Sequence, residues 1–149
     1  QAELRVSRAR RARSADGGVT WSLPRVRMDL TSPFKSQLSH PEIKNDEAGR
    51  IWVLWQEMAP SPNRWQLLIN RSDDYGKTWL KEAIRLTGPG QRGEKFRNPS
   101  FHADRSGHLY VVWGGGPGGV QELYLNRSQD FGATWLPREG RIGKPQKGT

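Results

Sequence analysis

The chain has 149 residues, no cysteine, and 24 Lys and Arg against 15 Asp and Glu, a formal net charge of +9. Without cysteine, thiol catalysis, disulfides and Cys-ligated zinc are excluded. No run reaches the ~18 apolar residues of a membrane-spanning helix, and Gln1 to Ser14 lack an apolar core, so we expect neither a transmembrane segment nor a signal peptide in this chain.

The positive charge is concentrated at the start of the chain. Residues 1–28 hold seven arginines and two acidic residues, a net charge of +5, and residues 29–149 hold 17 basic and 13 acidic residues, a net of +4. Such a basic run can dock on nucleic acid, an anionic membrane or an acidic protein surface, and it can also be a solvated strand. The candidate docking residues are Arg8, Arg10, Arg11 and Arg13.

An eight-residue motif, S-x-D-x-G-x-T-W, occurs at residues 14–21, 72–79 and 128–135. The residues upstream of the second and third motifs also resemble each other. The matching stretches are Leu67–Arg71 with Leu123–Arg127, Gly49–Trp55 with Gly107–Trp113, and His40–Ile43 with Asn98–Phe101. Each full unit therefore has four short segments rich in β-branched and aromatic residues, separated by turn-forming residues, which predicts four strands. No helical period is sustained, so little helix is expected.

In chain order, the first unit (1–30) contains only the third and fourth strands of the pattern, predicted at 5–13 and 21–28. The second unit (38–87) has strands predicted near 40–46, 50–56, 65–71 and 79–86. The third unit (97–142) has them near 98–103, 108–113, 121–127 and 135–142, and a tail follows at 143–149. Four strands in a repeat of this length predict an all-β fold, a partial β-propeller of about two and a half four-stranded antiparallel blades.

The motif lies between the third and fourth strands of each unit, where a tight turn is needed. Its Asp can accept hydrogen bonds from the turn and from the Thr hydroxyl. Its Gly permits a positive φ, and its Trp offers a large apolar surface to neighbouring strands. These residues are expected to be structural: Asp16, Gly18, Thr20, Trp21, Asp74, Gly76, Thr78, Trp79, Asp130, Gly132, Thr134 and Trp135.

With these three motifs the chain resembles, over about residues 5–142, the sialidase-like β-propellers, whose bacterial neuraminidase repeats are called Asp boxes. That group includes hydrolases, sortilin-type receptors and photosystem assembly factors, so the resemblance implies a fold and leaves the function open. For a sialidase it implies three arginines that clamp a carboxylate, a Tyr–Glu nucleophile pair and an Asp acid/base.

The nearest match to the Phe/Tyr-Arg-Ile-Pro motif of such enzymes is Phe96-Arg97-Asn98-Pro99, in the third unit. Tyr75 lies inside a motif, and Tyr110 and Tyr124 are interpreted as packing residues in strands, with no plausible activating Glu next to any of the three on the binding face. We therefore assign no catalytic residue and favour a protein that is not an enzyme; an enzyme would be an exo-sialidase-like glycoside hydrolase.

Strand parity puts the loops 56–64, 87–97 and 114–120 on the side of a propeller that binds ligands. Glu57 and Arg97 are the tentative ligand-face residues there, with ordinary surface charge as the simpler interpretation. The histidines His40, His102 and His108 lack metal-ligand spacing, so we expect no metal and no cofactor.

Two and a half blades do not close a propeller ring, which normally has about four to eight blades. We therefore expect either that the chain is a piece of a longer propeller or that other protein chains, a second copy or a larger assembly, complete or cover the open edges. The predicted function is a non-catalytic scaffold or accessory subunit that docks on an acidic protein or anionic membrane surface, in the periplasm or outside the cell.

The alternative is a fragment of a sialidase-like glycoside hydrolase or a glycan-binding propeller, with a glycan as ligand. Nucleic acid is disfavoured, because no recognised fold or interleaved aromatic platform accompanies the charge.

Overall fold

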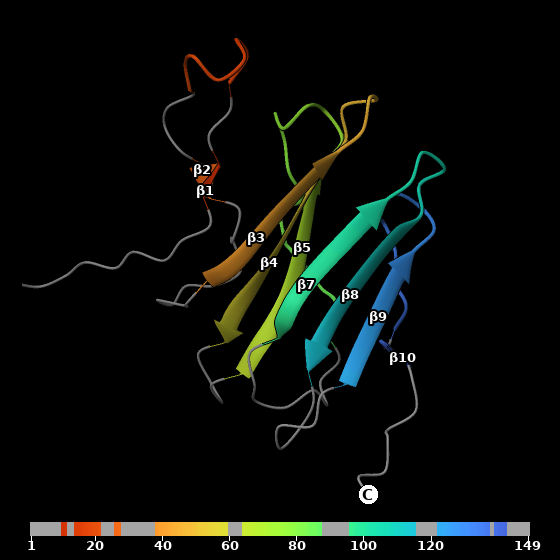
Figure 1. The fold of residues 1–149 in the computed structure, drawn as a ribbon. Coiled ribbons are helices and arrows are strands. Elements are labelled where there is room, and N and C mark those ends of the chain that lie inside the picture. Colours follow the sequence, from red (N-terminus) through yellow and green to blue (C-terminus); the bar gives the residue numbers. More distant parts are fainter. Residues whose placement is uncertain are drawn as a thin grey trace, which may run out of the picture.

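We describe the protein from a computed structural model, over residues 10–11, 14–21, 26–27, 38–59, 64–87, 96–115, 122–137 and 139–142 (Figure 1). This part of the chain contains strands and no helix, so the all-β prediction is confirmed. The strands are β1 (Arg10–Arg11), β2 (Val26–Arg27), β3 (Leu38–Asn45), β4 (Ile51–Ala59), β5 (Arg64–Ser72), β6 (Ile84–Arg85), β7 (Arg97–Ala103), β8 (Leu109–Gly115), β9 (Glu122–Ser128) and β10 (Gly140–Ile142). In these residues there is no helix with the length and apolar character to span a membrane.

Each of the two full repeat units forms its own four-stranded antiparallel sheet. The second unit has the strand order β3-β4-β5-β6 and the third unit the order β7-β8-β9-β10. Every strand pairs with its neighbours in sequence, as the four-segment pattern predicts. In the first unit, β1 and β2 form a two-stranded antiparallel sheet. Figure 1 shows β3 and β7 side by side where the two large sheets meet.

The third and fourth strands pair in the same register in all three units. The equivalent pairs are Arg10 with Arg27, Leu68 with Arg85, and Tyr124 with Arg141. The offsets between successive pairs, 58 and 56 residues, equal the offsets between successive motifs. The described backbone of the first unit therefore follows the same plan as the two complete sheets.

A proline-containing bulge interrupts the first strand of both sheets. The register with the next strand shifts between Ser39 and Glu42 in β3 and between Arg97 and Ser100 in β7. The residue before the proline, His40 or Asn98, has a positive φ of 51° or 45°. Because proline lacks an N–H, it is tolerated in a sheet where the ladder is broken.

The predicted strand boundaries need two corrections. β4 continues to Ala59, just before Pro60, so residues 57–59 belong to a strand where a loop was predicted. The fourth strands predicted at 79–86 and 135–142 are reduced to Ile84–Arg85 and Gly140–Ile142. In the third unit, Pro137 follows Leu136 and has no N–H to continue the ladder. Of the strands predicted at 5–13 and 21–28, residues 5–9, 12–13, 22–25 and 28 lie outside the described residues.

One buried cluster joins the two large sheets. It includes Trp52 and Leu54 of β4 together with Leu109, Val111 and Trp113 of β8, all 1% exposed or less. Successive side chains of a strand point to opposite faces, so one face of β8 packs toward the second unit. The other face carries Tyr110 and Val112 away from it.

Candidate functional site

The motif forms the same hydrogen-bonded turn in every unit. In the second unit, the backbone N–H and the hydroxyl of Thr78 donate to the Asp74 carboxylate at 2.8 and 2.6 Å, and the Ser72 hydroxyl donates to it at 2.8 Å. The indole N–H of Trp79 donates to the Gly76 carbonyl at 3.2 Å. The equivalent bonds are present in the first and third units.

These hydrogen bonds hold the motif carboxylates in their ionised form. The hydroxyl of Thr78 lowers the pKa of Asp74 to about 2, and the hydroxyl of Thr134 does the same for Asp130. The pKa of Asp16 is also lowered, chiefly by the hydroxyl of Thr20. A carboxylate fixed by its own turn is a weak base and has no proton to donate near neutral pH. The motif is thus a folding device.

An aromatic residue of the motif packs against the turn between the first two strands of the same unit. Phe131 has a φ of +57°, and its N–H donates to the Gly107 carbonyl at 2.8 Å. A Cβ added to Gly107 would lie 2.7 Å from the Phe131 ring. Tyr75 and Gly49 repeat this contact in the second unit. In the first unit, Gly17 takes the place of the aromatic residue. A Cβ added to Gly17 would meet nothing within 4 Å.

Side chains of the second unit also contact the third unit at the third motif. The indole N–H of Trp52 and the guanidinium of Arg71 donate to the Phe131 carbonyl at 3.0 and 3.1 Å. The guanidinium of Arg50 lies 3.6 Å from the centre of the Phe131 ring, a cation–π contact. We call this set of contacts the seam. It consists of the backbone carbonyl and the ring of Phe131 on the third unit and three side chains on the second.

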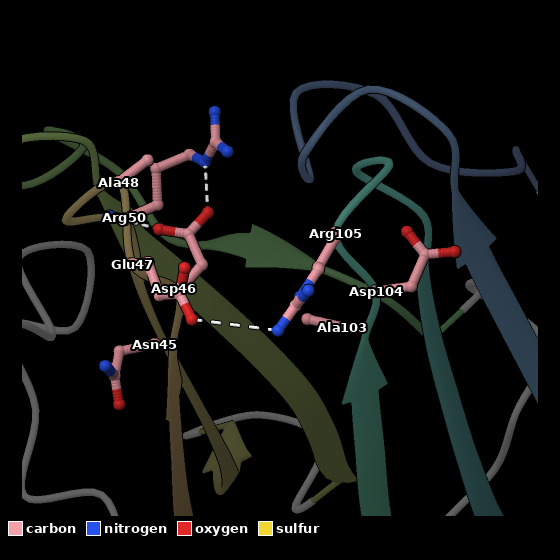
Figure 2. A pocket seen from close by; sticks show the side chains of 8 residues that line it. All are labelled: Asn45, Asp46, Glu47, Ala48, Arg50, Ala103, Asp104 and Arg105. Carbon is pink, nitrogen blue, oxygen red and sulfur yellow. Dashed lines mark hydrogen bonds and ion pairs between the residues drawn. The ribbon is translucent and has the colours of Figure 1, made fainter.

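A cavity of about 460 Å³ lies between the first turns of the two sheets (Figure 2). The residues that line it are Asn45, Asp46, Glu47, Ala48, Arg50, Ala103, Asp104 and Arg105. Its acidic groups all have basic neighbours: Asp46 pairs with Arg50 at 2.6 Å, Glu47 with Arg105 at 3.7 Å, and Asp104 with His108 at 2.8 Å. The cavity lies at the end of the sheets that carries the motifs, opposite to the end predicted for ligands.

The pKa values of the two cavity aspartates are lowered. For Asp46, hydrogen bonds from Arg50 lower the pKa against an opposing effect of burial, which is the largest single influence. For Asp104, the backbone N–H of His108 is the main cause. Both carboxylates are therefore committed to local turns. The cavity presents no free acid or base for catalysis among its described residues.

The two tentative ligand-face residues do not form a site together. Glu57 lies inside β4 and is only 1% exposed, so the interpretation as surface charge is wrong for this residue. Among the described residues, its Oε1 atom has no hydrogen-bond partner. Arg97 is exposed and begins β7, opposite Gly114. No ion pair joins the two side chains in the part of the chain that the structure describes.

A tyrosine does lie beside a glutamate, contrary to the sequence interpretation. The Tyr124 hydroxyl donates to the Glu122 carboxylate at 2.5 Å, and Arg141 binds the other carboxylate oxygen at 2.7 Å. Burial and this hydrogen bond raise the pKa of Tyr124 to about 12, while the pKa of Glu122 is lowered, chiefly by the same bond. The phenol is thus kept protonated beside a weakened base. The ring of Tyr124 stacks on Trp113 with centroids 6.1 Å apart, so it also packs as predicted.

The predicted docking arginines are described only in part. Arg8 and Arg13 lie outside the described residues, and for Arg10 and Arg11 the structure gives the backbone pairing of β1. In the described ranges no group of three His, Asp or Glu residues is placed to hold a metal ion. Comparison with protein-family models, with curated proteins and with solved structures gave no match.

Sequence reasoning missed the cavity and the seam. A repeated signal for the cavity was present: Asp46 and Asp104 each precede a glycine by three residues, at the same place in the two units. Asp and Gly at this spacing are typical of turns. The seam had no such signal, because its acceptor is a backbone carbonyl that every residue type carries.

Proposed function

We propose that the protein is a non-catalytic Asp-box propeller scaffold, an accessory subunit that docks on a larger protein or on a membrane-associated assembly. The observation that carries this proposal is that the motif carboxylates bind their own turns. Asp16, Asp74 and Asp130 each accept hydrogen bonds from their own turn, and none is left to act on a substrate.

Contacts of the third motif and a shared buried cluster pack the second and third units together, which supports a role as a scaffold. The seam joins the second and third units through Phe131, and the buried cluster extends across both sheets. Units of this kind present extended surfaces for partners.

The residues that an enzyme of the sialidase type would need are poorly placed. The phenol of Tyr124, with a pKa of about 12, is a poor nucleophile at neutral pH. This point weighs against the alternative, a fragment of a sialidase-like glycoside hydrolase or glycan-binding propeller.

The partner surface that we propose is acidic or anionic, because the first unit is rich in arginine. Residues 1–28 have a net charge of +5, and a basic run of this size attracts an acidic protein or an anionic lipid surface. The compartment that we propose, periplasmic or extracellular, rests on the resemblance to sialidase-like propellers alone.

A fluorogenic sialoside assay tests the absence of catalysis. The expected result is turnover no greater than that of a heat-denatured sample of the same chain. Turnover that Arg97→Ala abolishes and Arg105→Ala leaves intact would overturn the proposal in favour of a glycoside hydrolase. Arg105 is a suitable control because its side chain is 95% exposed and lies in the turn at the other end of the sheet.

The mass and composition of the native particle that contains this chain test the accessory role. We expect the chain to be recovered with other polypeptides, and a free monomer in its native source would contradict the proposal. Replacement of Arg8, Arg10, Arg11 and Arg13 by Gln should release the chain from that particle. Four matched changes at Lys44, Lys81, Arg85 and Arg105, which remove the same charge elsewhere, should not.

A further inference from the structure

The first motif differs from the other two in the residue that follows its aspartate. Asp16 is followed by Gly17, whereas the equivalent residues of the second and third motifs are Tyr75 and Phe131. No other Asp-Gly pair, and no Asn-Gly pair, occurs in the 149 residues. Asp-Gly is the pair that most readily forms a succinimide, because glycine has no side chain to obstruct its own backbone nitrogen as that nitrogen approaches the aspartate carboxyl carbon.

In the second and third motifs, the aromatic residue protects the aspartate before it. The backbone N–H groups of Tyr75 and Phe131 donate to the carbonyls of Gly49 and Gly107, each at 2.8 Å. The nitrogen that would attack the aspartate is therefore held in a hydrogen bond. Each aromatic ring also packs against the glycine to which its N–H donates, so the residue is fixed by its side chain as well. Gly17 has no side chain that could fix it in this way.

The hydrogen bonds of the first motif oppose the reaction while the turn is closed. The Asp16 carboxylate accepts the Thr20 N–H at 2.9 Å, the Ser14 hydroxyl at 2.7 Å and the Thr20 hydroxyl. These bonds keep the carboxylate ionised, and an ionised carboxylate is a poor electrophile. The turn must therefore open locally before the Gly17 nitrogen can attack. Such local openings cost less free energy than global unfolding.

We propose that Asp16 is a site of spontaneous isoaspartate formation and that this modification is confined to the first of the three motifs. In the open turn, the backbone nitrogen of Gly17 attacks the carbon of the protonated Asp16 carboxyl group. The new N–C bond forms, the nitrogen loses its proton, and one water molecule leaves, which gives a five-membered succinimide. Water then adds to one of the two ring carbonyls and breaks its bond to the nitrogen. Addition at one carbonyl restores aspartate, and addition at the other gives isoaspartate, so water is the only co-reactant.

Isoaspartate cannot form the turn of the motif. Its backbone runs through the former side chain, which adds one methylene group before Gly17 and leaves the free carboxylate on the α-carbon. The carboxylate can then no longer accept hydrogen bonds from Ser14 and Thr20 together. The modification thus opens the turn of the first unit, in which residues 1–28 have a net charge of +5. Its chemistry is independent of the proposed function.

Peptide mapping of the whole chain tests the site. The folded chain is kept at physiological temperature and neutral pH and is sampled over weeks. Trypsin cleaves after Lys and Arg, which places the three motifs in separate peptides, residues 14–25, 72–77 and 128–138. An isoaspartyl methyltransferase with a labelled methyl donor marks isoaspartate, whose mass equals that of aspartate. We expect label to accumulate in residues 14–25 and to stay at the level of a fresh sample in the other two peptides.

Three matched substitutions test the cause. Gly17→Ala adds only a Cβ, which would meet nothing within 4 Å, and it should remove most of the label from residues 14–25. Tyr75→Gly gives the second motif an Asp-Gly pair and should make residues 72–77 accept label. Thr20→Val removes one hydrogen bond to the Asp16 carboxylate, so it should speed the labelling of residues 14–25 by at least about twofold.

Three results would overturn the proposal. The first is the absence of label from residues 14–25 of the folded chain, since the closed turn would then protect Asp16 completely. The second is equal labelling of the three motif peptides, and the third is equal labelling of the original chain and Gly17→Ala, because the residue after the aspartate would then have no effect. If Gly17→Ala does not fold, as judged by tryptophan fluorescence, the comparison of the three peptides within the original chain decides the matter.

Discussion

Replacement of Trp52 by alanine tests whether the seam holds the two large sheets together. The side chain is 1% exposed, and its indole N–H donates to the Phe131 carbonyl at 3.0 Å. Truncating a buried Trp to Ala typically costs about 3–5 kcal/mol. Because Arg71 still donates to the same carbonyl at 3.1 Å, no acceptor is orphaned, and we expect the lower part of that range, about 3–4 kcal/mol.

Tyr110→Ala is the matched control, since Tyr110 occupies the equivalent place in the third sheet and is 37% exposed. It loses the contact with the His108 ring and cross-strand contacts, which together are worth about 1 kcal/mol. Urea unfolding followed by tryptophan fluorescence gives both values. Trp52→Phe removes the hydrogen bond and part of the buried ring, so it should cost more than the about 1 kcal/mol of a hydrogen bond alone and less than Trp52→Ala.

Equal destabilisation by Trp52→Ala and Tyr110→Ala would refute this reasoning, because it would mean that burial at the seam adds nothing. A further diagnostic is the shape of the unfolding curve. If the seam couples the two large sheets, they unfold in one transition in the original chain and in two separate transitions in the Trp52→Ala variant.

Three further predictions concern single side chains. The pKa of Asp130 is lowered from 3.8 to about 2, so as the pH falls its carboxylate is protonated in the unfolded chain before it is protonated in the folded chain. The stability that the carboxylate contributes above pH 3.8 is therefore lost toward pH 2, and Asp130→Asn should make the urea midpoint of unfolding change less over this pH range. Gly107→Ala should cost about 2–4 kcal/mol, from a φ of +90° and a contact of 2.7 Å with the Phe131 ring, whereas Gly140→Ala, whose nearest atom is 3.8 Å away, should change stability by less than about 0.5 kcal/mol. Ultraviolet titration should show one tyrosine ionising near pH 12, and Tyr124→Phe should remove that step; a Tyr124 that titrates near pH 10 would contradict the packing described for it.

Sequence spacing predicted the turns and the four-stranded antiparallel units, because both depend on local chemistry. The hydroxyl of Thr78 reaches Asp74 four residues away, and Gly76 supplies the positive φ between them. A motif of this kind specifies its own turn. It also specifies where the next strand pairs, which is why Leu68 and Tyr124 have equivalent partners.

The sequence predictions are wrong where the conformation or burial of a residue depends on distant neighbours. Glu57 was predicted to lie in a loop after a strand ending near residue 56, but Gln56 and Glu57 are both buried within β4. The burial of a polar pair depends on what packs against the sheet, and a short sequence window does not contain that. Likewise, the positive φ of Phe131 is unusual for an aromatic residue, and it is stabilised by the packing of the ring over Gly107.

The meander connectivity of the two large sheets has a kinetic consequence. Every ladder in them joins strands that are consecutive in the chain, so each sheet can form through short loop closures. The contacts of Phe131 with Trp52 and Arg71 bridge 79 and 60 residues, so we expect them to form later than the ladders within each sheet. We therefore expect substitutions at Trp52 to speed unfolding while leaving the folding rate nearly unchanged, as for residues whose contacts form after the transition state.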